Sequence, residues 1–463
     1  MKKFLSLAGL LALALNFAAC NGVSNSSSSS TQTQNAQGQV FTTGEDAPVS
    51  SVVAFNITIN SITLNNSSST ALVLSTPTTV DFGRLVGLRS LLGFNSVAPG
   101  TYTSATFTFA TNPAPSINYV DLTTTPPSIG TATGTLSSPK VTVSFPSGAP
   151  LVVGSNGLAG LHIDFDLRQS LAMNNGNLVI NNGTIAVTPT LDVVAVSAAS
   201  DLGQITEFTG NIVSVNSSAN SFVIQGPYGF QETIDVNSST SYNGSNSLGS
   251  LITNGIVSVE GTVQDDGSIL ASGVELITTD KAFISGRILA VSPGPVVTMF
   301  VGEELGTSAT IPVDSVYTVD LGLVSTYDIC FIDNWFTNEL FTGSSLVVGQ
   351  RIFVGGTYQG NTFTPDMVSL RRQGVIGSLV ANSVNITSGN QGNYQMTNDA
   401  LMSYSAGGPF TVYTGNLTTF VNINGLAGLQ AAGAANLISR GLVFYDPNTQ
   451  KPIVWAGRVR VLP

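Results

Sequence analysis

Residues 55–64 read Phe-Asn-Ile-Thr-Ile-Asn-Ser-Ile-Thr-Leu, and this stretch carries the pattern that decides the fold. Apolar and polar residues alternate, as they do in a β-strand that buries one face. The apolar phase changes once, because the residues up to Ile59 share one face whereas Ile62 and Leu64 have the other parity. One extra residue near Asn60-Ser61 would correct the phase. We therefore expect a β-bulge there, or a break between two short strands.

The same alternation recurs along the chain of 463 residues, for example in residues 106–109 and 257–260. Thr, Val, Ile and Phe fill these runs, and Gly, Asn, Ser and Pro separate them. Residues 85–92 and 426–438 are the two candidates for short helices. The sequence therefore predicts an all-β protein made of antiparallel sandwiches or small barrels.

The composition excludes several classes of protein. Charged residues make up 9% of the chain and apolar residues 42%, so this is not a highly charged, disordered chain and it can fill hydrophobic cores. One His and two Cys exclude a zinc finger, a disulfide framework and a site built from several imidazoles. The net charge of −11 argues against nucleic acid as a partner, because phosphates favour Lys and Arg.

The first 20 residues resemble the signal peptide of a bacterial lipoprotein. Lys2 and Lys3 precede an apolar run of about 14 residues, which is too short to span a membrane, and Ala-Ala-Cys follows at residues 18–20. The resemblance implies that Cys20 is acylated and becomes the mature N-terminus. Phe17 stands where such signals usually have Leu. The alternative is a plain secreted protein that is cut near Ala19.

Residues 21–39 carry no charge and almost no apolar side chain, so they are predicted to form a disordered, Ser- and Asn-rich tether. Cys20 would then fasten the chain to a membrane through its lipid. Asn21, in place of the Asp that resembles an inner-membrane retention signal, favours the outer membrane. The expected location is the bacterial cell envelope, on its periplasmic or surface face.

Residues 40–199 are predicted to form the first domain. Four landmarks in this region lie at residues 46–49, in the strand that reaches Ile59, and at residues 97–102 and 163–167. In this order they resemble domain-of-unknown-function family 4382, which occurs in bacterial surface lipoproteins. The resemblance implies an immunoglobulin- or transthyretin-like β-sandwich and no established activity.

An internal repeat follows the first domain. Its units are predicted at residues 204–278, 282–372 and 373–463, and each opens with a strand that has a central glycine. The period of about 75 to 90 residues is too long for a solenoid and suits tandem small domains. A glycine in the middle of a strand marks a bulge or a sharp barrel corner. The units resemble domain-of-unknown-function family 5666, a small barrel similar to an OB-fold, and the third unit departs most from the pattern.

His162, Asp164 and Asp166 are the most suggestive group for chemistry. In a strand they share one face, while Ile163 and Phe165 point to the other. An imidazole and two carboxylates in a row could hold a divalent cation, with structural calcium as the expected ion and Glu45 or Asp46 as a further candidate ligand. The alternative is that the two Asp residues cap loops or lie on a solvated strand face.

Other catalytic arrangements find little support, and no catalytic residue is assigned. A Ser-His-Asp triad would have to use His162, and no glycine-flanked serine elbow is present. Asp265-Asp266-Gly267-Ser268 is better explained as a hairpin turn. Cys330 lies in an apolar run beside acidic residues, which indicates a buried structural thiol.

These patterns predict a non-enzymatic, lipid-anchored extracytoplasmic protein without a cofactor. It would act as a binding or envelope-structural module whose partner is a protein or a glycan of the envelope. The alternative is a calcium-dependent carbohydrate binder, or a hydrolase, that uses the acidic strand around Asp164. The ligand, the oligomeric state and the membrane face are left open by the sequence.

Overall fold

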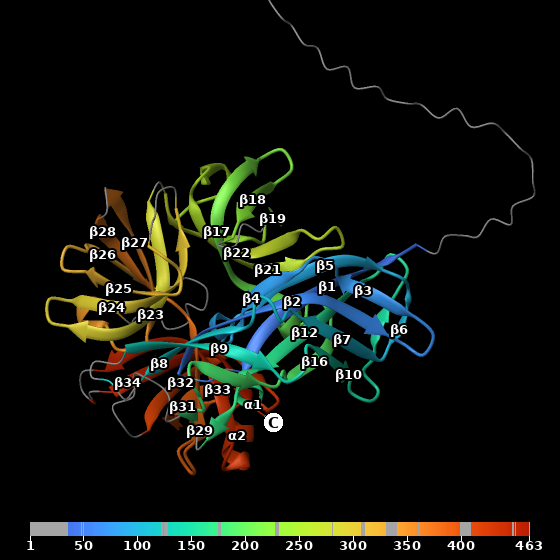
Figure 1. Cartoon of the computed structure of the whole chain (residues 1–463). Helices are drawn as coiled ribbons and strands as arrows, with labels where there is room; N and C mark the ends of the chain where they lie inside the picture. The colour runs from blue at the N-terminus through green and yellow to red at the C-terminus, as the bar shows by residue number, and fades with distance from the viewer. Residues whose placement is uncertain are drawn as a thin grey trace, which may run out of the picture. The chain divides into compact units, whose positions relative to one another are not determined.

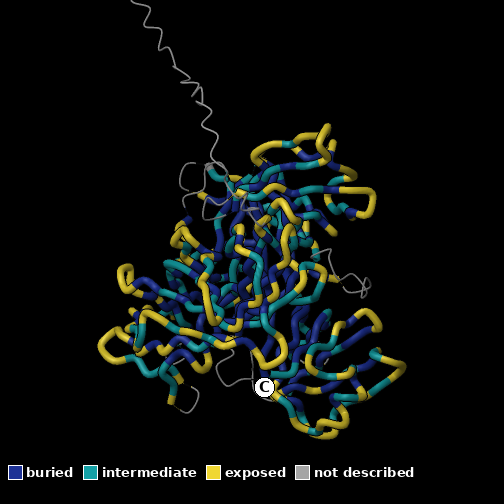
Figure 2. The backbone as a smooth tube through the Cα atoms, turned by 90° about the vertical axis from the view of Figure 1, so that its right-hand side faces the viewer, coloured by how far each residue is buried: buried dark blue, intermediate teal, exposed yellow. Residues whose placement is uncertain are grey.

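The computed structural model describes residues 36–462 except 48, 50, 122–123, 125–127, 175–176, 227–230, 280, 307–310, 330–339, 360–361, 399–408, 447–448 and 450. This described part is almost entirely β, as the alternating pattern predicts (Figure 1). Exposed residues gather at the turns, and buried residues follow the strands (Figure 2). The predictions for Cys20, Cys330 and the signal segment concern residues outside the described ones.

The first domain consists of two sheets that enclose one core. The first sheet has the order β16-β12-β1-β5, with strands β1 (Gly38–Ala47), β5 (Ser90–Val97), β12 (Leu158–Asp166) and β16 (Leu191–Val196). The second has the order β10-β7-β2-β8-β9-β15, with β3 and β4 also paired to β2; its strands are β2 (Val52–Asn65), β3 (Thr70–Leu74), β4 (Thr78–Asp81), β7 (Ser104–Phe109), β8 (Ser116–Asp121), β9 (Ser128–Leu136), β10 (Lys140–Ser144) and β15 (Thr184–Val187). Phe165 of β12 lies in the core between Phe55 and Phe109, with ring centroids 5.3 and 6.1 Å away.

Strand β2 contains the predicted change of phase. Its pairing with β7 shifts between Ile59 and Ser61, which leaves Asn60 as the extra residue of a β-bulge. Ile59 before the bulge and Ile62 after it are both fully buried in the same core. The predicted bulge is confirmed, and it lets both halves of a long strand face inward.

The helix predicted at residues 85–92 is wrong. The segment follows a 3-10 turn, η1 (Phe82–Arg84), and enters strand β5 at Ser90. Leu91 packs in the core of the first barrel, whereas Leu92 packs in the core of the first domain. Adjacent leucines are thus buried on opposite faces of one strand, and this double burial removed the alternation that would have identified it. The remaining short elements of the domain are β6 (Gly100–Tyr102), β11 (Leu151–Val153), α1 (Leu167–Ser170), β13 (Met173–Asn174) and β14 (Asn177–Leu178).

Three sheets of six strands follow, and we call them the first, second and third barrels. After η2 (Asp201–Gly203), the first comprises β17 (Gln204–Asn216), β18 (Ser221–Gln225), β19 (Gln231–Asp235), β20 (Ser241–Asn243), η3 (Leu248–Ser250), β21 (Ile256–Val263) and β22 (Ile269–Thr278). The second comprises β23 (Ala282–Ser292), β24 (Val296–Leu305), β25 (Ser315–Asp320), β26 (Thr326–Ile329), η4 (Gly343–Ser345), β27 (Arg351–Gln359) and β28 (Thr362–Leu370). The third comprises β29 (Gln373–Leu379), β30 (Asn385–Ser388), β31 (Gln391–Asn398), β32 (Phe410–Val421), α2 (Gly425–Ala432), β33 (Asn436–Asp446) and β34 (Lys451–Val461).

The first and second barrels have the same topology, β19-β18-β17-β21-β22-β20 and β25-β24-β23-β27-β28-β26. The third has the order β29-β33-β34-β32-β31-β30. All three share a series in which the first strand pairs with the fifth, the fifth with the sixth, and the sixth runs parallel to the fourth. Pairing of β19 with β22 closes the first barrel, and pairing of β29 with β31 closes the third.

Glycines in the middle of strands mark sharp bends, as predicted. In the fifth strand of each barrel a glycine lies at a shift of the pairing register: Gly261, Gly356 and Gly441. A Cβ atom on Gly441 would overlap the carbonyl oxygen of Trp455, and one on Gly286 of the opening strand of the second barrel would overlap that of Phe300. The backbones of the paired strands can approach this closely only because glycine has no side chain.

Helix α2 confirms part of the second predicted helix. The helix ends at Ala432 and is capped by Gly433, whose φ is 69°. Strand β33 begins at Asn436, so the helix covers only the first half of residues 426–438. Leu426 and Leu429 of this helix are fully buried. In the part of the chain that the structure describes, no helix is long and apolar enough to cross a membrane.

The four domains share their apolar cores. Phe41 of the first domain lies in the core cluster of the first barrel, and Phe444 of the third barrel lies in that of the second. Phe300 of the second barrel packs with Val120 of the first domain. The domains are therefore arranged in tandem along the sequence but bury surface against one another.

Candidate functional site

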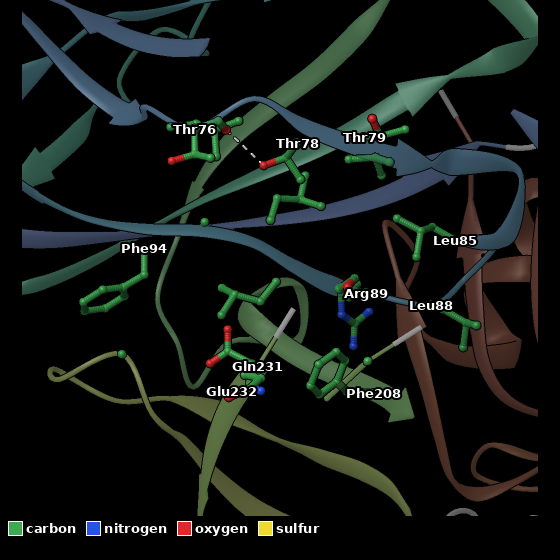
Figure 3. A pocket seen from close by; sticks show the side chains of 18 of the residues that line it. Thr76, Thr78, Thr79, Leu85, Leu88, Arg89, Phe94, Phe208, Gln231 and Glu232 are labelled. Atoms are coloured by element: carbon green, nitrogen blue, oxygen red, sulfur yellow. Dashed lines mark hydrogen bonds between the residues drawn. The ribbon is translucent and has the colours of Figure 1, made fainter. Parts of the chain in front are cut away.

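A cleft of about 1020 Å³ opens between the first domain and the first barrel (Figure 3). One side comes from residues 73–95, which include strands β4 and β5, and the other from strands β17 and β19 and the turn before β22. The buried residues Arg89, Glu207 and Arg351 form its floor, and exposed residues such as Thr76 lie at its mouth.

Arg89 joins the two sides at the floor. Its backbone N–H donates to Oγ1 of Thr206 at 2.8 Å, and its carbonyl oxygen accepts from the N–H of Thr206 at 3.0 Å. Its Nε donates to the carbonyl oxygen of Gln204 at 2.9 Å. Because these bonds are buried, they fix the two sides of the cleft relative to each other.

Glu207 has an unusual backbone at the floor. The pairing of β17 with β21 shifts between Ile205 and Phe208, and Glu207, inside this bulge, has a φ of 53°. Such a conformation costs a non-glycine residue on the order of 1–3 kcal/mol. In return the carboxylate accepts from Nη1 of Arg351 at 2.9 Å and Nε of Arg371 at 3.0 Å. Burial would raise the pKa of Glu207, but these two guanidinium groups lower it to about 2.

Two other carboxyl groups line the cleft and have raised pKa values. Burial raises the pKa of Glu232 to about 7, and its carboxylate has no hydrogen-bond or ion-pair partner among the described residues. Burial also raises the pKa of Asp81 to about 6, although its Oδ1 accepts from the N–H of Phe55 at 2.8 Å. Both groups can therefore exchange protons near neutral pH.

The rest of the lining mixes hydroxyl groups with aromatic rings. The hydroxyl-bearing residues are Ser75, Thr76, Thr78, Thr79, Ser90, Thr206, Thr209, Thr233 and Ser268. In Figure 3, Phe94 and Phe208 lie on opposite sides of Gln231 and Glu232. The ring of Phe94 packs closely against Gly267 in the turn before β22. A Cβ atom on Gly267 would lie only 3.0 Å from that ring.

An arginine network lies beneath the cleft and between the domains. At least eight of the ten arginines form ion pairs with Asp or Glu side chains: Arg84, Arg89, Arg351, Arg371, Arg372, Arg440, Arg458 and Arg460. Arg371 is fully buried and connects the second barrel to Glu207 and Glu275 of the first. Isolated buried charges are costly, so these arginines depend on their carboxylate partners. A partner lies in another domain in every case except that of Arg89, which pairs with Glu45 of its own domain.

The third barrel contributes the other half of the network. Nη1 of Arg458 lies 3.2 Å from Oε1 of Glu45 in strand β1, and Nη1 of Arg460 lies 2.9 Å from Oδ2 of Asp164 in strand β12. Burial would raise the pKa of Glu45, but Arg458 and Arg89 lower it to about 2. These pairs fasten the end of the chain to its first domain.

The predicted cation site is arranged differently in the structure. His162 is buried, its Nδ1 lies 3.1 Å from Oγ1 of Thr43, and burial lowers its pKa to about 4, so the ring is neutral at pH 7. Asp164 is paired with Arg460 instead. Asp166 caps helix α1, where its Oδ1 accepts from the N–H of Gln169 at 3.0 Å.

The three side chains are therefore not brought together around one point. In the described ranges, no group of three His, Cys, Asp or Glu side chains is placed to hold a metal ion. The interpretation that the two carboxylates cap a loop holds for Asp166 alone. A solvated strand face is wrong, because His162 and Asp164 are 2% and 4% exposed beneath the third barrel.

The sequence does not reveal the cleft, and it contains one signal for the network. Arg371-Arg372 and Arg458-Val459-Arg460 lie in or beside apolar strands of a chain with few charges. Such residues must be paired if they are buried. The pattern indicates that partners exist, but it does not identify them.

Comparison with known families gives two matches. Residues 37–182 match the family described as "Domain of unknown function (DUF4382)", and residues 209–275 match "Domain of unknown function (DUF5666)". A comparison with curated proteins finds no match. The chain therefore contains a DUF4382 domain followed by a DUF5666 domain, in the order that the sequence landmarks predict.

Proposed function

We propose that this chain is a lipid-anchored extracytoplasmic protein of the bacterial envelope, and that it acts as a non-catalytic binding module. The observation that carries the proposal is the cleft, which is open, lined by both polar and apolar groups, and held between two domains by buried hydrogen bonds and ion pairs. A concave site with a few polar groups fixed in a rigid frame is typical of ligand binding.

Most of the side chains that could catalyse a reaction are already engaged. His162, the chain's one imidazole, is buried beneath the third barrel. Among the described carboxyls of the cleft, Asp81 and Glu207 have hydrogen-bond donors, and Asp266 accepts from the N–H of Ser268 at 3.0 Å. This leaves Glu232, whereas glycoside hydrolysis uses a pair of carboxyl groups.

The N-terminal sequence supports the location. A short apolar signal ends at Cys20, and an uncharged segment separates Cys20 from strand β1, which begins at Gly38. A chain fastened in this way would present the cleft to the envelope space or to the outside, with the tether setting its reach.

Acylation is tested by labelling cells with an alkyne analogue of palmitate and by mass spectrometry of the mature N-terminus. We expect the label and an acylated Cys20 in the parent chain, and no label in Cys20→Ser. Cys330→Ser, at the only other cysteine, is the matched control and should keep the label. An unmodified N-terminus at another residue would contradict anchoring, and turnover of a substrate by the purified chain would contradict a non-catalytic role.

A further inference from the structure

We infer that the cleft between residues 73–95 and the first barrel binds a neutral saccharide. The inference deepens the proposed function, since it names the ligand class of the same site. It is based on four features of the lining: its compensated charge, its unpartnered polar groups, its aromatic rings and its size.

The positive charges that line the cleft have carboxylate partners inside the protein. Arg84 pairs with Glu303, Arg351 pairs with Glu207, and Nη1 of Arg89 lies 3.8 Å from Oε2 of Glu45. An anionic ligand such as a phosphate or a uronate would have to compete with these internal partners. The floor therefore favours a ligand without charge.

The polar groups left over suit the hydroxyl groups of a sugar. Glu232 and Gln231 are adjacent on strand β19 and both line the cleft, and neither side chain has a hydrogen-bond partner among the described residues. Adjacent side chains of a strand point to opposite faces, so the Glu232 carboxylate can accept from a hydroxyl on one side of β19 and the Gln231 amide can bond one on the other. At the floor, Oε2 of Glu207 is buried and also lacks a partner.

The strained backbone of Glu207 gives a further indication. Bulges and left-handed residues occur near binding sites, where they aim a side chain. The bulge in β17 places Glu207 in the lining while Arg351 and Arg371 hold its other oxygen. Glu207 thereby holds Arg351, which also lines the cleft, in a fixed position at the floor.

The two rings supply the apolar part of the site. Phe94 and Phe208 are half-buried, so part of each ring remains open to the cleft. The C–H face of a pyranose is apolar, and a ring that covers it excludes water from the hydrogen bonds on its edge. The volume of about 1020 Å³ is at the upper end of small-molecule sites, which indicates an oligosaccharide.

The test is titration calorimetry of the full mature chain in detergent with neutral oligosaccharides of glucose, galactose, mannose and N-acetylglucosamine. We expect saturable binding of at least one of them at one site per chain. Thr233→Trp places a bulky ring in the lining and should weaken binding at least tenfold. Thr318→Trp, at an exposed threonine of the equivalent strand β25, is the matched control and should leave it unchanged. Glu232→Gln should weaken binding about tenfold, because a charge-assisted hydrogen bond is lost.

The inference is overturned if no neutral oligosaccharide binds, if only acidic ones bind, or if both tryptophan variants weaken binding equally. A negative result in this binding experiment would not contradict lipid anchoring, because the labelling experiment does not depend on a ligand. Cleavage of a bound saccharide would support the ligand class and contradict only the non-catalytic role.

Discussion

Replacing Arg371 with methionine should destabilise the folded chain by about 3–5 kcal/mol, the usual cost of breaking a buried ion pair from one side. The guanidinium is fully buried and lies 4.1 Å above the ring of Phe353. It donates to Glu207 at 3.0 Å, and its Nη2 lies 2.8 Å from Oε2 of Glu275. Methionine keeps much of the apolar contact but removes the positive charge shared by two buried carboxylates.

The assay is urea unfolding followed by circular dichroism at pH 7. Arg168→Met, at an exposed arginine of helix α1, is the control and should change the unfolding free energy by less than about 0.5 kcal/mol. The double variant Arg371→Met/Glu275→Gln should be more stable than the sum of its two single changes by about 1–3 kcal/mol, because one unpaired charge is also removed. If Arg371→Met stays within about 1 kcal/mol of the parent chain, the network does not hold the domains together.

Two further predictions concern pH and backbone crowding. Burial raises the pKa of seven described carboxyl groups: Asp46, Asp81, Asp164, Glu232, Glu275, Glu304 and Asp314. The folded chain binds the protons of these groups more tightly than the unfolded chain does, so stability should rise as pH falls from 8 to about 5; the lowered pKa of His162 opposes this between about 6.5 and 4. Below about pH 4.5 stability should fall, because the pKa of Glu207 is lowered to about 2; urea midpoints that rise steadily from pH 5 to pH 8 would contradict this balance. Gly286→Ala should cost more than about 2 kcal/mol in urea unfolding, whereas Gly154→Ala, with open space at its Cβ position, should cost less than about 0.5; equal effects would refute the crowding.

Local features of the fold could be predicted where a single strand carried the signal. The bulge at Asn60 followed from a change of parity within one strand, and the turn at Asp265-Asp266-Gly267-Ser268 does connect β21 to β22, with a φ of 90° at Gly267. The segment 85–92 could not be assigned correctly, because leucines buried on both faces of a strand match a helix as well as they match a strand.

The candidate site depended on residues that are far apart in the sequence. Asp164 was identified as important, but its partner Arg460 lies 296 residues away, and Glu45 and Arg458 are 413 residues apart. An acidic strand face has the same sequence pattern whether a cation, water or a neighbouring arginine covers it. The sequence therefore identified charged residues of consequence, but it could not identify the distant arginines that pair with them.

The sequence by itself determined an all-β chain, the repeat with its central glycines, and the order of the two matched domains, because alternation and glycine spacing are local properties of the backbone. Only the tertiary structure decided that the domains share cores, that the arginines pair across them, and that a cleft forms between residues 73–95 and the first barrel. The physical reason is that alternation reports which face of a strand is buried, while the side chains that bury it come from another domain.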